Sequence, residues 1–190
     1  MDLLNSAIEA ELRANYCRAI TYYKKLAQEG SSLDRVGIQQ AIARCYEKLG
    51  SLNEAALWHE KAGQGYMKLP SKIMGASERA YYGMIEFHSA VQDYAPSLAM
   101  RRAAKSYLDA LRVCLRAGKE GYSHEMLFAA HLCAKIRDFT RAAQFFADTA
   151  EQFKKEKVPK LARETTEWAA KYYERSSNAR AARKLRAAGV

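Results

Sequence analysis

Small and larger apolar residues recur along the chain at helical spacing, on segments separated by tight breaks. The clearest copy of this sequence pattern spans residues 45–62, and further copies span residues 13–26 and 135–146. A small residue is followed four positions later by a larger one, so both lie on one helix face. These pairs are Ala19 with Tyr23, Ala55 with His59, Ala103 with Tyr107, and Ala142 with Phe146. The repetition predicts stacked helical hairpins in which an alanine lets the partner helix approach closely.

The breaks divide the chain into five expected hairpins. Each pairs two helices, at residues 3–14 with 16–29, 34–49 with 52–67, 72–93 with 96–117, 120–136 with 139–154, and 158–175 with 178–188. The best-specified turn has Gly50 at a left-handed helix end, followed by a capping box of Ser51 and Glu54. The other expected first-turn and capping residues are Ser32 or Asp34, Pro96, Asp138, Pro159, Ser176 and Ser177.

These elements predict an all-α chain folded as a right-handed superhelix of about five antiparallel helical hairpins. With 190 residues and only 3 prolines and 10 glycines, we expect one helical repeat domain over residues 1–190.

Four aromatic doublets fit this packing, because adjacent helix residues point about 100° apart. We expect one ring of each doublet in the core, at Tyr22-Tyr23, Tyr81-Tyr82, Phe145-Phe146 and Tyr172-Tyr173.

The charge is divided unevenly along the chain. Residues 1–100 hold 11 basic and 11 acidic side chains, whereas residues 101–190 hold 20 basic and 10 acidic ones. The second half therefore carries the whole net charge of +10, which favours acidic partners. No stretch is long and apolar enough for a transmembrane segment, and the amino terminus lacks the pattern of a signal peptide, so we expect a cytoplasmic protein.

No motif indicates catalysis, a metal site or a cofactor. The four cysteines lie far apart without a CxxC pair, which favours buried free thiols at Cys17, Cys45, Cys114 and Cys133. The four histidines lack the spacing of a metal-binding motif, and His59 takes the place of a packing residue. Gly63 and Gly65 lie at an expected helix end without the remainder of a phosphate-binding loop. We therefore expect a protein that is not an enzyme.

The packing residues resemble those of tetratricopeptide (TPR) repeat proteins. The second hairpin matches best, through Ala43, Tyr46, Gly50, Ala55 and Ala62. Residues with corresponding places in other hairpins are Ala7, Ala19, Tyr23, Ala103, Ala130, Ala142, Phe146 and Ala181. The long, uneven hairpins are more similar to the SNAP-like branch, the soluble NSF attachment proteins and their relatives.

This resemblance implies a non-catalytic adaptor or scaffold whose concave, partly basic groove binds an acidic peptide, helix or subunit. The asparagines of the peptide-carboxylate clamp found in some TPR proteins are missing. The residues expected to bind the partner are Arg44, Lys48, His131, Lys135, Lys160 and Arg163.

Further basic clusters leave a second hypothesis open. They comprise Arg101, Arg102, Lys105, Lys154, Lys155, Lys157, Arg180, Arg183, Lys184 and Arg186. Such arrays favour binding of nucleic acid through the basic carboxy-terminal half, although no RNA-binding motif accompanies them. The sequence leaves the oligomeric state open, with self-pairing of the solenoid ends as a further alternative.

Overall fold

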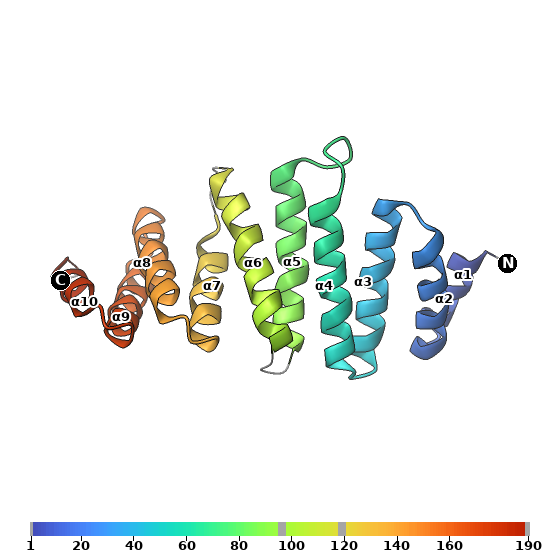
Figure 1. Cartoon of the computed structure of the whole chain (residues 1–190), viewed down its shortest axis with the longest axis horizontal. Helices are drawn as coiled ribbons and strands as arrows, with labels where there is room; N and C mark the ends of the chain where they lie inside the picture. Colours follow the sequence, from blue (N-terminus) through green and yellow to red (C-terminus); the bar gives the residue numbers. More distant parts are fainter. Residues whose placement is uncertain (1, 95–97, 118–120, 189–190) are drawn as a thin grey trace. The chain divides into compact units, whose positions relative to one another are not determined.

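The chain is built from helices joined by short turns (Figure 1). The computed structural model describes residues 2–94, 98–117 and 121–188. Over these residues it contains ten α-helices and no strand, which confirms the predicted all-α class. Within the described ranges, no helix combines the length and the apolar character needed to cross a bilayer.

The helices belong to two compact units, Met1–Ala117 and Gly118–Val190. The first unit contains α1 (Leu3–Leu12), α2 (Tyr16–Glu29), α3 (Ser32–Lys48), α4 (Leu52–Lys68), α5 (Ala76–Asp93) and α6 (Leu98–Arg116). The second contains α7 (Ser123–Lys135), α8 (Phe139–Lys155), α9 (Pro159–Arg175) and α10 (Ala179–Ala188). Within each unit successive helices pack against one another, as the hairpin pattern predicts. One continuous domain over residues 1–190 stays a prediction.

Alanines line the contacts between neighbouring helices. Ala19, Ala55, Ala103 and Ala142 are fully buried, as predicted. Their larger partners Tyr23, His59, Tyr107 and Phe146 are buried as well. The small residues thus lie where close helix approach requires them. The last alanine was placed wrongly, because Ala182 is buried whereas Ala181 is half-buried.

Five of the turns share one backbone geometry. A residue with positive φ follows the helix, at Ala14, Gly50, Arg137, Lys157 and Ser177. The next residue donates its N–H to a carbonyl five positions earlier, as in Ser51 to Tyr46 at 3.0 Å and Asp138 to Cys133 at 2.8 Å. This is the Schellman arrangement, which satisfies carbonyls at the end of a helix. Only the Gly50 turn carries the expected glycine.

A buried alanine follows each of these turns at a fixed distance. It lies four residues after the residue that comes next to the one with positive φ. The pairs are Asn15 with Ala19, Ser51 with Ala55, Asp138 with Ala142, Val158 with Ala162, and Asn178 with Ala182. In each pair the alanine N–H donates to the carbonyl of the earlier residue, which starts the new helix. The motif recurs before α8, α9 and α10 of the second unit. The repeating element there is therefore a single helix with the turn that precedes it. Counting from Asn178 explains why Ala182 is buried and Ala181 is not.

The capping predictions are partly confirmed. The Asp138 side chain accepts from the N–H of Arg141 and caps α8, and Pro159 begins α9, both as predicted. Ser51 precedes α4, but its side chain makes no capping hydrogen bond, so the capping box is not formed. Pro96 lies outside the described residues.

Two helices are capped by neighbours of the expected residues. The Ser31 hydroxyl caps α3 by accepting from the N–H of Asp34, in place of Ser32 or Asp34. The Asn178 side chain accepts from the N–H of Ala181 at 3.2 Å, so Asn178 takes the role expected of Ser176 or Ser177. Asparagine is an effective cap, because its short side chain reaches the first free N–H groups.

The unusual turn residues allow a stability test. Ala14 is exposed with φ 56°, a conformation that costs a non-glycine residue about 1 kcal/mol. We expect Ala14→Gly to raise the free energy of unfolding of the first unit by about 1 kcal/mol, measured by denaturant titration. Gly50→Ala, at φ 70° in the same unit, should lower it by a similar amount. Equal stability of the two variants would contradict this account of the turns.

The aromatic doublets follow the predicted division in three of four places. Tyr23, Phe146 and Tyr172 are buried, while the preceding or following ring is half-buried. Tyr81 and Tyr82 instead are 39% and 40% exposed, so neither enters the core. The prediction of one core ring is therefore wrong for this doublet.

Three of the four cysteines are buried, at Cys45, Cys114 and Cys133, as predicted. Cys17 is exposed, which corrects the expectation for that residue. It follows Tyr16 at the start of α2 and is two residues, about 200° of helix rotation, from the buried Ala19, so it lies on the outer face of the helix.

Candidate functional site

A groove of about 830 Å³ opens on the first unit. Its lining comes from α1 to α4, and we call it the α1–α4 groove. The apolar side chains of its lining include Leu4, Ile8, Leu26, Leu33, Ile38 and Tyr66. Leu4, Ile8 and Leu33 are each more than 40% exposed. The groove thus presents apolar surface to solvent, which is typical of a binding site.

The charged side chains around this groove are mostly acidic. Asp2, Glu11, Glu29 and Asp34 contribute four carboxylates, and Arg44 contributes one guanidinium. Tyr23 donates its hydroxyl to Glu11 Oε2 at 2.7 Å; burial, with this neighbouring carboxylate, raises the pKa of Tyr23. The phenol therefore stays neutral and does not add to the negative charge. Of the six residues predicted to bind a partner in a partly basic groove, Arg44 alone is among the lining residues of the α1–α4 groove.

The six residues expected to bind a partner are divided between the two units. Arg44 lies at the α1–α4 groove, and Lys48 is exposed at the end of α3. The other four belong to the second unit, at His131, Lys135, Lys160 and Arg163. A common binding surface for all six stays a prediction.

His131 takes part in an aromatic cluster of the second unit. Its ring lies edge-on to Phe146, with centroids 5.0 Å apart, and also contacts Trp168. Burial lowers the pKa of His131, which favours the neutral ring at neutral pH. Tyr172 stacks on Phe146 with centroids 5.4 Å apart and extends the cluster. The His131 ring therefore packs against this cluster, although the residue as a whole is exposed.

Several members of the basic clusters make ion pairs within the chain. Arg102 binds Glu60, Lys154 binds Glu151, and Arg186 binds Glu174. The remaining members are exposed, at Arg101, Lys105, Lys155, Lys157, Arg180, Arg183 and Lys184. Two of these exposed basic residues lie in the first unit and five in the second.

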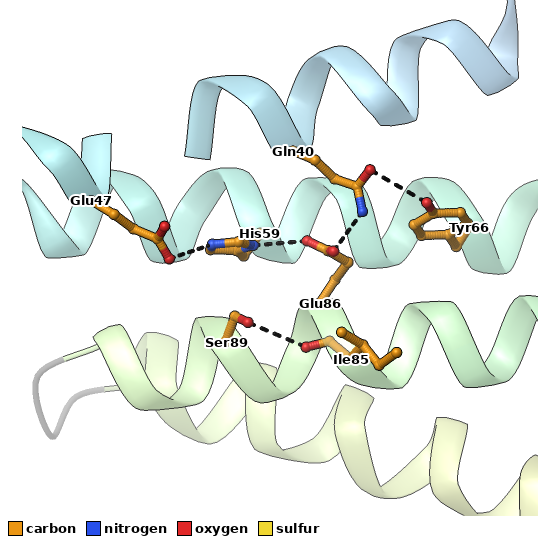
Figure 2. Close-up of polar contacts among 7 residues, drawn as sticks. All are labelled: Gln40, Glu47, His59, Tyr66, Ile85, Glu86 and Ser89. Atoms are coloured by element: carbon orange, nitrogen blue, oxygen red, sulfur yellow. Dashed lines mark hydrogen bonds and ion pairs between the residues drawn. The ribbon is translucent and has the colours of Figure 1, made fainter. Parts of the chain in front are cut away.

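A chain of polar side chains crosses α3, α4 and α5 beside the helix contacts (Figure 2). His59 is buried and lies between two carboxylates: its Nδ1 is 2.8 Å from Glu86 Oε2, and its Nε2 is 3.0 Å from Glu47 Oε1. Gln40 donates its amide to the second oxygen of Glu86 at 2.6 Å, and Tyr66 donates to Gln40. The arrangement holds the imidazole in one orientation.

The surroundings set the protonation of this cluster. Burial alone would lower the pKa of His59, but the hydrogen bonds with Glu86 and Glu47 outweigh it and raise the pKa. Asp93 also faces the cluster, and burial together with the Glu47 carboxylate raises the pKa of Asp93. Negative charge is therefore concentrated around one histidine in the first unit.

A second buried ion pair connects α4 with α6. Glu60 is 1% exposed, and both of its oxygens accept from the Arg102 guanidinium, at 2.6 and 2.7 Å. The Tyr94 hydroxyl donates to the same carboxylate at 3.1 Å. The fork of an arginine matches both oxygens of a carboxylate, so this contact fixes the two helices in register.

Neither polar cluster could be predicted from local sequence patterns. His59 and Glu47 are 12 positions apart, and His59 and Glu86 are 27 apart, so no local motif joins them. One usable signal was a histidine where the repeat expects an apolar packing residue. A buried imidazole requires polar partners, which predicts carboxylates or amides on the neighbouring helices.

No family model matches the chain, and no curated protein is similar to it in sequence. Solved structures with a similar fold include RapI and BtubC. The apo form of RapI has 14% sequence identity and a TM-score of 0.57, with 98% of this chain and 67% of RapI covered. BtubC (BKLC) from P. vanneervenii has 18% identity and a TM-score of 0.56, with 96% of this chain and 77% of BtubC covered.

Both neighbours have TPR-like helical repeat folds. This chain has a helical-repeat fold of the same kind. The predicted resemblance is therefore confirmed for the helical-repeat fold. At these identities the likeness concerns the fold alone, and the closer similarity to the SNAP-like branch stays a prediction.

Proposed function

We propose that this helical-repeat protein is a non-catalytic adaptor that binds a segment of another protein in the α1–α4 groove. The supporting observation is the combination of exposed apolar side chains with an acidic rim on a helical-repeat scaffold. A groove built on packed helices exists before the partner arrives, so little ordering entropy is lost on binding.

The rim indicates the chemistry of the partner. Four carboxylates and one guanidinium line the groove, so basic side chains on the partner would complement its charge, and apolar side chains of the partner would contact its apolar lining. The proposed occupant is therefore an amphipathic segment rich in leucine-like and basic residues. This replaces the acidic occupant suggested by the net charge, since the local charge at the groove is opposite to that of the whole chain.

Selection from a random peptide library displayed on phage tests this proposal with a defined probe. We expect enrichment of peptides that combine apolar residues with Lys or Arg. Leu33→Asp should weaken binding of the enriched peptide about tenfold in fluorescence anisotropy, because it places a charge on the apolar floor. Leu33 lies in the first turn of α3, where an acidic residue is compatible with the helix, so the fold is retained.

Charge variants provide the second arm of the experiment. Glu29→Lys on the rim should weaken binding about threefold, and more at low salt. The matched control is Glu164→Lys, an exposed residue of α9 in the second unit, which should leave the affinity unchanged. Enrichment of acidic peptides, or equal affinities of all three variants, would overturn the proposal.

The exposed basic residues of the second unit favour nucleic acid as a second candidate partner. Arg180 and Arg183 are exposed one turn apart on α10, with Lys184 beside them. Phosphate contacts of this kind weaken steeply with salt. Binding of a labelled single-stranded RNA at about 50 mM salt that is lost in Arg180→Ala/Arg183→Ala would support this candidate, and no binding at that salt would exclude it.

A further inference from the structure

Three potential metal ligands from three helices meet beside the buried histidine. They are Glu47 at the end of α3, His59 in α4 and Asp93 at the end of α5. One ligand atom from each lies within 4.8 Å of the other two. An imidazole nitrogen and two carboxylate oxygens form a ligand set that suits divalent transition metals such as Zn²⁺.

The histidine is already oriented for such a role. Glu86 accepts from Gln40 through Oε1, and its Oε2 lies 2.8 Å from His59 Nδ1. A carboxylate accepts hydrogen bonds, so this contact assigns a proton to Nδ1 (Figure 2). Nε2 then points toward Glu47 and is the nitrogen available to a metal. A carboxylate that holds the second ring nitrogen is the usual outer partner of a metal-binding histidine.

The position between His59 Nε2 and the two carboxylates could hold a proton or a metal ion, and the surroundings of Asp93 favour the metal ion. A proton on Nε2 satisfies the 3.0 Å contact with Glu47 and nothing more. Asp93 Oδ2 is buried and has no hydrogen-bond partner among the described residues. Buried polar atoms are rarely left in this state, because each loses its hydration without a replacement. A divalent cation between the three side chains compensates the charges of Glu47 and Asp93 together.

We propose that Glu47, His59 and Asp93 form a binding site for a divalent transition metal ion, with Glu86 orienting the imidazole. Such an ion links three consecutive helices of the first unit. Glu47 is partly open to solvent, with 39% of its side chain exposed, which provides access for the ion and for a water ligand. The site is separate from the proposed peptide contact, because none of its ligands lines the α1–α4 groove.

Thermal unfolding with and without Zn²⁺ tests the site. The full chain, without a histidine tag and after treatment with a chelator, is titrated with ZnCl₂ at pH 7. We expect one bound ion per chain by calorimetry and a rise in Tm of about 5 °C at saturation. Asp93→Asn removes one charge without breaking a described hydrogen bond at Oδ2, so it should retain the fold. It should weaken Zn²⁺ binding at least about tenfold and abolish the rise in Tm.

Two controls separate this site from other ligands. Asp109→Asn, at an exposed residue of α6, should behave like the unmodified chain. Cys17→Ser removes the exposed thiol and should also retain the rise in Tm. The Co²⁺ complex should lack the charge-transfer absorption of a thiolate ligand. Absence of saturable binding, an unchanged Tm shift in Asp93→Asn, or a thiolate band would overturn the proposal.

Discussion

Replacing Arg102 with alanine is expected to lower the free energy of unfolding of the first unit by about 2 kcal/mol. The variant leaves Glu60, which is 1% exposed, with a buried charge, and its remaining partners among the described residues are the Tyr94 hydroxyl and the neighbouring Gln64 amide. Loss of one partner of a fully buried pair costs roughly 3–5 kcal/mol. We expect less here, because the Arg102 side chain is itself 58% exposed and water reaches the site after its removal.

Chemical denaturation measures this loss, and the adjacent arginine provides the control. Arg101 is exposed and makes no described ion pair, so Arg101→Ala should change stability by less than about 0.5 kcal/mol. Adding Glu60→Gln to the Arg102→Ala variant should recover part of the loss, because the buried group is then neutral. Equal stabilities of the two arginine variants would show that the ion pair has no structural role.

Replacing Gly63 with alanine is expected to destabilise the same unit by about 2 kcal/mol. An added Cβ lies 2.7 Å from Phe87 Cε1 and 2.9 Å from Cδ1, well inside normal contact distance. Phe87 is 2% exposed, so its ring is enclosed by protein and a shift of the ring would disturb its packing. Gly63 is therefore the point of close approach between α4 and α5, and it lies within α4 and not at its end as predicted.

Gly37→Ala is the matched control, because Gly37 also lies inside a helix and an added Cβ meets nothing within 4 Å. That variant should gain up to about 1 kcal/mol from the better helix propensity of alanine. Opposite signs for the two variants in denaturant titrations would support the packing account. A gain in stability for Gly63→Ala would contradict it.

The helices and their order follow from local patterns and were predictable for that reason. An alanine four residues before a bulky residue specifies a helix face wherever it occurs, as at Ala19 and Ala142. Most of the turns were not predicted, because glycine was expected at the residue with positive φ. Ala14, Arg137 and Lys157 occupy this position instead, and the Schellman hydrogen bonds form there as they do at Gly50. These residue types do not by themselves indicate a left-handed backbone conformation.

The candidate sites depend on distances between helices, which the sequence pattern does not contain. The total charge of +10 suggested an acidic partner, but the charged side chains that line the α1–α4 groove are mainly carboxylates from the neutral half of the chain. Arg102 belonged to a predicted basic cluster, but its guanidinium binds Glu60, which is 42 positions away in the sequence. Long-range pairs of this kind decide which charges remain available to a partner.

The role of the α1–α4 groove is tested most directly by methyl NMR of the full chain titrated with the peptide selected by phage display. The account predicts that the methyl signals of Ile8, Leu33 and Ile38 shift and saturate together, while those of Leu161 and Leu185 in the second unit stay in place. Shifts confined to the second unit, or saturation without any change at the three groove residues, would contradict it.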